Sequence, residues 1–110
     1  MYDYYGSQDG DLKAVSETVA AAVGAELSRR ESSYIGEYYQ FKSASGEELA
    51  VRANLLTDED GEFYQWPEYS GYVTVVYARA GDSSWLDETR AQLAGVAGLV
   101  FLAREDGDAA

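Results

Sequence analysis

The clearest strand in the sequence is Tyr72-Val73-Thr74-Val75-Val76-Tyr77-Ala78-Arg79. It consists mainly of β-branched and aromatic residues, which fit the pleated surface of a sheet. Gly81 ends the run on one side, and Pro67 lies outside it on the other, so no missing amide donor interrupts the strand. We therefore expect this segment to be the central strand of a sheet, with the rest of the chain arranged around it.

A second strand is predicted between Glu48 and Leu55, where apolar and other residues alternate without an error. The two sides of this strand are Leu49, Val51, Ala53 and Leu55 against Glu48, Ala50, Arg52 and Asn54. This alternation predicts a strand that is covered on one face. The tyrosine-rich segment from Ser32 to Lys42 predicts another strand, joined to the previous one by a turn at residues 43–47.

A first helix is predicted between Asp11 and Arg30. Asp9 or Asp11 can serve as its N-cap, and Arg29 and Arg30 suit the negative end of the helix dipole. Its apolar stripe has spacings of three and four residues and consists of Leu12, Val15, Val19, Ala22, Val23 and Leu27. Residues 1–10 are polar and predict a turn-like segment before the helix.

A second helix is predicted from Ser84, which begins a capping box, to the glycines Gly95 and Gly98, which end it. Its apolar face consists of Trp85, Leu86, Thr89, Leu93 and Ala97. The apolar run from Leu99 to Arg104 then predicts a buried strand, with a continued helix as the alternative. Residues 105–110 predict an acidic tail.

These elements predict an α+β fold in the order α-β-β-β-α-β, with an antiparallel sheet of about four strands and two helices packed on one face. Residues 1–110 should form a single domain, because their number suits one modest core and no linker or repeat interrupts them. The other face of the sheet should carry polar residues and tyrosines. The expected core consists of Leu12, Val15, Val19, Val23, Leu27, Leu49, Val51, Val73, Val75, Leu86, Leu93 and Val100.

Charge and composition exclude several classes of function. The 20 acidic and 8 basic residues give a net charge of −12, which repels nucleic acid and anionic membrane surfaces and attracts basic proteins. Cysteine and histidine are absent from the sequence, which excludes thiol nucleophiles, Ser-His pairs and the standard zinc sites. We therefore predict a binding protein and not an enzyme, with no catalytic residue, no cofactor and no metal. The acidic N-terminus predicts no signal peptide, and a chain without cysteine forms no disulfides, which suits the cytosol. We therefore predict a cytoplasmic location.

The acidic residues also suggest a calcium site or an acid–base pair, but the spacing of the residues argues against the first and the large number of acids against the second. The segment around Gly61 resembles a calcium loop, but Leu56 would then occupy the first ligand position and Pro67 the position of the bidentate Glu. Glu37 and Glu48 could face each other across a hairpin as an acid–base pair. With 20 acids in the chain, however, some pair lies close together by chance.

The most distinctive segment lies between Thr57 and Tyr72, where acidic residues are interleaved with large aromatic ones and Lys and Arg are absent. Stiff aromatic rings supply contact area at a low entropic cost, and carboxylates steer a basic partner. We predict that the end of a hairpin presents this segment as a partner-binding surface made of Asp58, Glu59, Asp60, Glu62, Tyr64, Trp66, Glu68 and Tyr69. For the aromatic members the alternative is local packing over the edge of the sheet.

A short resemblance lies in the segment Arg30-Glu31-Ser32-Ser33-Tyr34-Ile35-Gly36-Glu37-Tyr38-Tyr39. It resembles a Glu-Ser-x-Tyr-x-Gly-Gly-x-Tyr pattern of small acidic immunity proteins of bacterial polymorphic toxin systems, with Glu37 in place of the second glycine. The resemblance implies a protein that binds and neutralises a cognate toxin, often a basic nuclease. It implies no catalytic residue.

The leading hypothesis is an acidic inhibitor that binds a basic protein, namely the immunity partner of a toxin. Carboxylates placed where a nuclease expects phosphates would block it without any chemistry. One alternative is a nucleic-acid-mimicking inhibitor of a DNA- or RNA-binding protein, such as a phage anti-defence protein, whose acids should form a long stripe. Another is a generic interaction domain, and an alternative interface is the tyrosine-rich face around Tyr34 and Tyr38.

Overall fold

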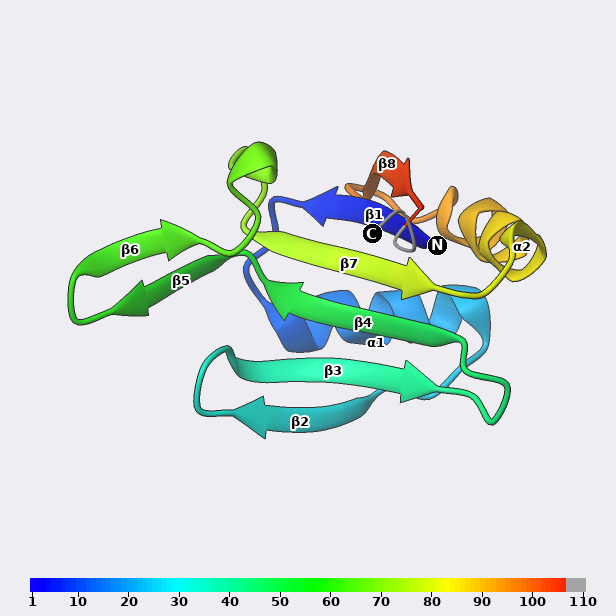
Figure 1. Cartoon of the computed structure of the whole chain (residues 1–110), viewed down its shortest axis with the longest axis horizontal. Helices are drawn as coiled ribbons and strands as arrows, with labels where there is room; N and C mark the ends of the chain where they lie inside the picture. Colours follow the sequence, from blue (N-terminus) through cyan, green and yellow to red (C-terminus); the bar gives the residue numbers. More distant parts are fainter. Residues whose placement is uncertain (107–110) are drawn as a thin grey trace.

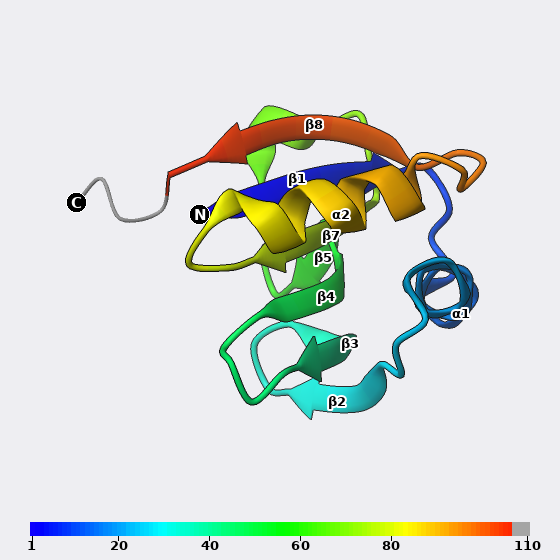
Figure 2. The same ribbon diagram turned by 90° about the vertical axis from the view of Figure 1, so that its right-hand side faces the viewer.

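The computed structural model describes residues 1–106, which form an antiparallel six-stranded sheet with helices on one face (Figures 1 and 2). A separate two-stranded sheet protrudes from one end of the main sheet. The elements along the chain are β1 (Tyr2–Ser7), α1 (Leu12–Val23), β2 (Ser28–Ser32), β3 (Gly36–Lys42), β4 (Glu48–Ala53), β5 (Leu55–Asp58), β6 (Gly61–Tyr64), a 3-10 turn (Pro67–Tyr69), β7 (Thr74–Arg79), α2 (Ser83–Leu93) and β8 (Val100–Glu105). The predicted α+β class is confirmed, but the main sheet has six strands and not about four. Neither described helix is long and apolar enough to cross a membrane.

Strand β7 lies inside the main sheet, between β4 and β1, as its sequence predicts. The strand order is β2-β3-β4-β7-β1-β8, and each neighbouring pair is antiparallel. The registers place side by side Tyr39, Val51, Val76 and Tyr5. Because side chains alternate along a strand, these residues share one face, and it is the face that both helices cover. We call the other side of the main sheet the open face.

The N-terminal segment is a strand, whereas its polar composition predicts a turn. β1 pairs with β7 and β8, so both of its neighbours come from the second half of the chain. Its Asp3 faces the helices, is fully buried, and accepts two hydrogen bonds from Arg104 of β8, at 2.6 and 2.9 Å. Arg104 also pairs with Asp87 of α2 at 2.7 Å. A bidentate guanidinium satisfies a carboxylate in the core, and this one lies 101 residues away, where no local pattern reveals it.

The first helix ends at Val23, whereas its apolar stripe predicts an end at Arg30. Gly24 follows with a left-handed φ of 68°, a C-cap geometry that stops the helix. The chain then enters β2, so Arg29 lies on a strand and not in the last helical turn. The strand predicted at residues 32–42 is β3 together with the turn before it, which contains Tyr34, and it forms a hairpin with β2. β1 and β2 are therefore the two additional strands of the main sheet.

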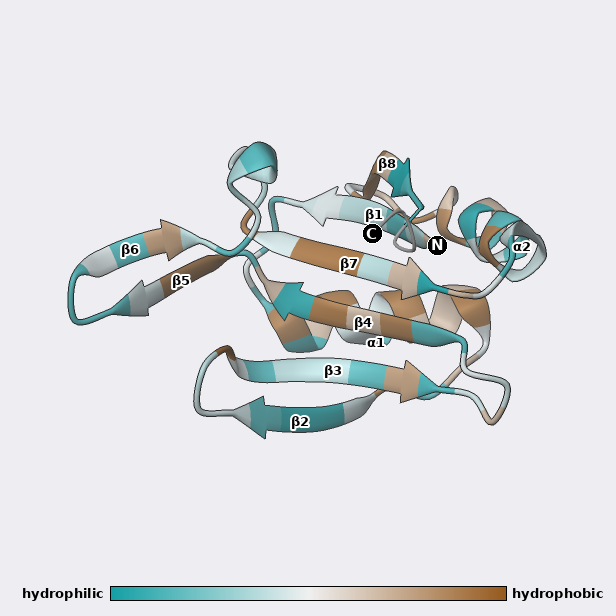
Figure 3. Ribbon diagram, in the orientation of Figure 1, coloured by the Kyte–Doolittle hydropathy of each residue, from teal (hydrophilic) through white to brown (hydrophobic). Residues whose placement is uncertain are grey.

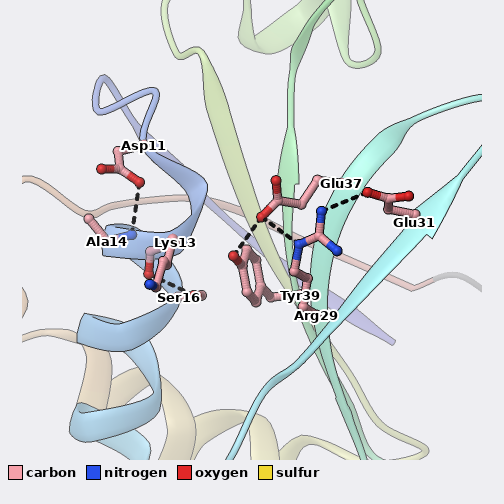
Figure 4. A network of polar contacts seen from close by, with 8 residues as sticks. All are labelled: Asp11, Lys13, Ala14, Ser16, Arg29, Glu31, Glu37 and Tyr39. Carbon is pink, nitrogen blue, oxygen red and sulfur yellow. Dashed lines mark hydrogen bonds and ion pairs between the residues drawn. The ribbon is translucent and has the colours of Figure 1, made fainter.

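Figure 4 shows the polar contacts at the start of α1 and on the β2–β3 hairpin. Asp11 is the N-cap of the helix, and its side chain accepts a hydrogen bond from the N–H of Ala14 at 3.1 Å. On the hairpin, Glu37 accepts a hydrogen bond from the hydroxyl of Tyr39 at 2.6 Å and pairs with Arg29 at 3.2 Å. The tyrosine hydroxyl first, and then the guanidinium, lower the pKa of Glu37. Arg29 thus joins β2 to β3.

The second helix and the strand after it largely follow the prediction. The N-cap of α2 is Asp82 and not Ser84, because the Asp82 carboxylate accepts a hydrogen bond from the N–H of Ser84 at 2.9 Å. The helix ends at Leu93, and β8 follows in place of a continued helix. β8 is an edge strand and not a buried one, since β1 alone flanks it in the main sheet as described. Residues 107–110 of the predicted acidic tail lie outside the described part of the chain.

The core lies between the main sheet and the two helices, and Figure 3 shows apolar residues along β4, β7 and α1. The predicted core residues buried there are Val15, Val19, Leu49, Val51, Leu86 and Leu93, with Leu12, Val23 and Leu27 packed against them while partly buried. Val73 is half-buried, and Val75 is fully buried but on the open face, opposite Gly6 and Arg52. Val100 was wrongly expected in the core, because it lies on the edge strand and is 46% exposed.

Strand β4 is covered on both faces, whereas its alternation predicts cover on one. Glu48 and Ala50 point to the open face and are nevertheless buried. Tyr77 of the neighbouring β7 supplies part of this cover, since its hydroxyl donates a hydrogen bond to Glu48 at 2.8 Å. The side chain of Gln40 on β3 donates to the same carboxylate oxygen at 2.7 Å. The open face therefore contains, at the start of β4, a buried carboxylate that accepts hydrogen bonds from two donors.

Candidate functional site

The predicted binding segment folds into two parts with different surroundings. The first part is the β5–β6 hairpin, residues 55–64, which protrudes from the end of the main sheet (Figure 1). We call it the acidic arm. The second part, residues 65–72, contains the 3-10 turn Pro67–Tyr69 and returns to the main sheet. The predicted binding residues are therefore divided between an arm and the body of the protein.

The tip of the acidic arm carries the carboxylates. The side chains of Asp58, Glu59, Asp60 and Glu62 are all exposed, and the arm contains no Lys or Arg. The Asp58 carboxylate accepts a hydrogen bond from the N–H of Asp60 at 2.8 Å, and Gly61 takes a positive φ of 113° to complete the turn. The arm therefore holds a concentrated negative charge away from the body of the protein.

Phe63 gives the acidic arm an exposed apolar side chain and is not among the predicted binding residues. Its side chain is 41% exposed and lies opposite Leu56 in the antiparallel register. Tyr64, which was selected, is half-buried at the base of the arm. Adjacent side chains of a strand point to opposite sides. A strand prediction for residues 61–64 is therefore the signal that places Phe63 and Tyr64 on different sides of the arm.

Asn54 fixes the base of the acidic arm. It is fully buried, and its side-chain amide donates hydrogen bonds to the carbonyl oxygens of Tyr69 at 3.0 Å and Tyr72 at 2.8 Å. Its side-chain oxygen accepts a hydrogen bond from the N–H of Trp66 at 2.7 Å, and its own N–H donates to the carbonyl of Val73 at 2.8 Å. The strand pattern assigned Asn54 only to a polar face. In the structure it joins both ends of the segment that returns to the sheet.

Trp66 and Tyr69 lie on the open face and not with the carboxylates of the arm. The ring centroid of Trp66 is 6.4 Å from those of Tyr4 and Tyr77, and Tyr69 is 5.9 Å from Tyr4. The guanidinium of Arg52 lies over the Trp66 ring at 5.0 Å. We call the aromatic cluster the set Tyr2, Tyr4, Trp66, Tyr69 and Tyr77. The positions of Trp66 and Tyr69 thus correspond to the alternative stated for the aromatic residues of this segment, namely packing against the sheet.

The aromatic cluster has an acidic margin, which includes the exposed Glu68 of the 3-10 turn. Burial, and then the negative charge of Glu105, raise the pKa of Tyr4 to about 12. Burial, and then the hydrogen bond to Glu48, raise the pKa of Tyr77 further above its ordinary range. The phenols of Tyr4 and Tyr77 are therefore neutral at neutral pH.

The alternative surface around Tyr34 and Tyr38 is divided between a turn and the open face. Tyr34 is 89% exposed in the β2–β3 turn, which lies at the same end of the main sheet as the acidic arm (Figure 1). Tyr38 is half-buried and lies opposite Arg30 and Arg52 in the register of the sheet. Tyr34 is thus an exposed ring near the arm, while Tyr38 extends the open face beyond the aromatic cluster.

The two other interpretations of the acidic residues, a calcium site and an acid–base pair, can be compared with the structure of residues 1–106. No group of three or more carboxylates there could hold a metal ion. Glu37 and Glu48 do not face each other, because Glu37 lies beside Tyr39 on the helix side and Glu48 points to the open face. The chain matches no protein-family model and no curated protein sequence.

Proposed function

We propose that this protein binds a basic protein in the cytoplasm and blocks it, as the immunity partner of a toxin. The acidic arm is the observation that carries the proposal: four exposed carboxylates lie at its tip, and it contains no basic residue to neutralise them. The net charge of −12 adds a long-range field that draws a basic partner toward the molecule.

Inhibition would require occlusion and no chemistry. A protruding hairpin can enter the groove in which a nuclease binds the backbone of its substrate, and its carboxylates can take the positions of phosphates. Phe63 supplies an apolar contact beside these charges. Because Asn54 already fixes the base of the arm, less conformational freedom is lost on binding.

A nucleic-acid mimic of wider range is less well supported. Such a protein needs its acids in a long stripe spaced like phosphates, whereas the acids of the predicted segment gather at one tip. A dedicated partner fits a compact charged tip better, since a small interface gains its specificity from a few placed charges.

The test neutralises the tip and measures association with a partner. Partners are captured from lysate of the source cells on immobilised protein, and binding kinetics with the recovered protein are measured at two salt concentrations. The triple variant Glu59→Gln, Asp60→Asn, Glu62→Gln keeps Asp58, which shapes the turn. At low salt we expect association to slow on the order of tenfold and to lose much of its salt dependence, because steering charges act on the on-rate.

The matched control removes the same charge elsewhere. Glu17→Gln, Glu26→Gln and Glu88→Gln neutralise three exposed acids of the body and should slow association much less. Phe63→Ala should mainly speed dissociation, because it removes a contact and no charge. Equal association rates for the two triple variants would refute a role for the arm.

A further inference from the structure

A cavity of about 410 Å³ lies between the start of α1, the connection from β1 to α1 and the loop after α2. Figure 2 shows this loop and this connection side by side above α1. Its walls are mainly apolar and include Val15, Tyr72, Val96, Leu99 and Val100. The volume falls within the range of clefts that hold ligands or inserted side chains, roughly 300–1,000 Å³.

The walls of the cavity are fixed by contacts outside it. The Tyr72 ring lies directly on Gly6, where an added Cβ would come within 2.5 Å of the ring. The hydroxyl of Thr74 donates a hydrogen bond to the carbonyl of Asp9 at 2.7 Å and holds the connection between β1 and α1. On the other side, the N–H of Leu99 bonds to the carbonyl of Val96 at 3.3 Å and closes the loop after α2. The cavity is therefore formed before anything enters it.

The charge at the cavity selects its occupant. Asp9 is the one residue with a charged side chain among the described residues that line it. One oxygen of its exposed carboxylate accepts a hydrogen bond from the N–H of Asp11 at 2.9 Å, which leaves acceptor capacity on the other. In a chain of net charge −12, an apolar cavity with a carboxylate beside it suits an apolar group that carries a positive charge nearby.

The edge of the main sheet favours a polypeptide as the source of this group. Val100 forms part of the wall, is 46% exposed, and begins β8. Among the described strands β8 has a single neighbour, β1, so main-chain groups on its outer side are available for pairing. An extended segment beside such an edge can pair through its main chain and place a side chain in an adjacent pocket.

We infer that this cavity receives a large apolar side chain that is flanked by basic residues in the partner protein. The inference rests on the proposed function for the basic character of the partner, and adds a second contact surface away from the acidic arm. An apolar side chain in the cavity would slow dissociation, whereas the arm would speed association.

The probes are three capped tripeptides, Lys-Phe-Lys, Glu-Phe-Glu and Lys-Gly-Lys, titrated into the isotopically labelled protein. NMR shifts of the methyl groups of Val15, Val96 and Leu99 report the cavity. We expect Lys-Phe-Lys to shift these methyls and to bind about tenfold or more tightly than Lys-Gly-Lys, because burial of a phenyl ring is worth at least that factor. Glu-Phe-Glu should bind weakly, because its charge is reversed.

Variants assign the site and separate it from the arm. Ala97→Trp, in the loop after α2, and Thr18→Trp, on α1, each add a large side chain to the lining of the cavity and should abolish the methyl shifts. One of the two variants serves if the other fails to fold. Asp9→Asn, which keeps an acceptor for Asp11, should weaken Lys-Phe-Lys selectively. The arm variant Glu59→Gln, Asp60→Asn, Glu62→Gln should still show the shifts. The inference is overturned if Lys-Phe-Lys causes no methyl shifts, if it binds no more tightly than Lys-Gly-Lys, or if binding is lost only in the arm variant. None of these outcomes refutes binding of the partner through the acidic arm.

Discussion

At the scale of single residues, Asn54 has the largest structural role in the candidate site. Replacing it with Ala removes three side-chain hydrogen bonds. The main-chain N–H of Trp66 and the carbonyl of Tyr72 lose this partner, while the carbonyl of Tyr69 still accepts a hydrogen bond from the N–H of Tyr72 at 3.0 Å. We expect Asn54→Ala to lower the free energy of unfolding by about 3 kcal/mol, measured by urea denaturation, because each unsatisfied buried group costs on the order of 1–3 kcal/mol. Gln65→Ala removes an exposed amide from the same segment and should cost less than about 0.5 kcal/mol. Similar losses in both variants would contradict this role of Asn54.

At the scale of elements, the acidic arm is separable from the main sheet. β5 and β6 form a sheet of their own, and Leu55 pairs with Tyr64 at its base. Replacing residues 56–63 with Asn-Gly should therefore close a short hairpin at this pair and change the free energy of unfolding by about 1 kcal/mol or less, because a two-residue type I′ turn fits such a pair. Circular dichroism and urea denaturation check the fold, and binding kinetics should show that the partner is lost. A shortened chain that does not fold would show that the arm belongs to the core of the structure.

At the scale of the whole molecule, buried tyrosines make the free energy of unfolding fall at alkaline pH. The pKa of Tyr4 rises to about 12 from an ordinary value of 10.0, and burial also raises the pKa of Tyr5 and Tyr77. Above pH 10 the unfolded chain loses these protons and the folded chain keeps them, so stability is complete below pH 10 and falls as the pH rises through the folded values. Denaturation followed from pH 8 to 12, with phenolate absorbance, measures the loss. Tyr4→Phe should move the alkaline midpoint upward, and an unchanged midpoint would contradict the assignment to Tyr4.

The parts of the fold that the sequence predicts are those specified by local patterns. β4, β7 and α2 each carry their own periodicity, and their positions follow from it. β1 could not be predicted, since its buried Asp3 is satisfied by a guanidinium from β8. In the site, the acids at the tip are exposed as their composition indicates. The position of Trp66 depends on Asn54, on the rings of Tyr4 and Tyr77 and on the guanidinium of Arg52, and no pattern in residues 57–72 contains these contacts.

The pairing of β1 also sets the order in which this chain can fold during synthesis. The ribosome makes β1 well before its two neighbours, β7 and β8, which come from the second half of the sequence. The N atom of Met1 donates a hydrogen bond to the carbonyl of Ala80, 79 residues later, and Asp3 pairs with Arg104, 101 residues later. Such distant contacts give the fold a high contact order, which slows folding. A nascent chain that stops before Thr74 leaves β1 with no strand beside it and Asp3 with no counter-charge, so this sheet closes only after β8 has been translated.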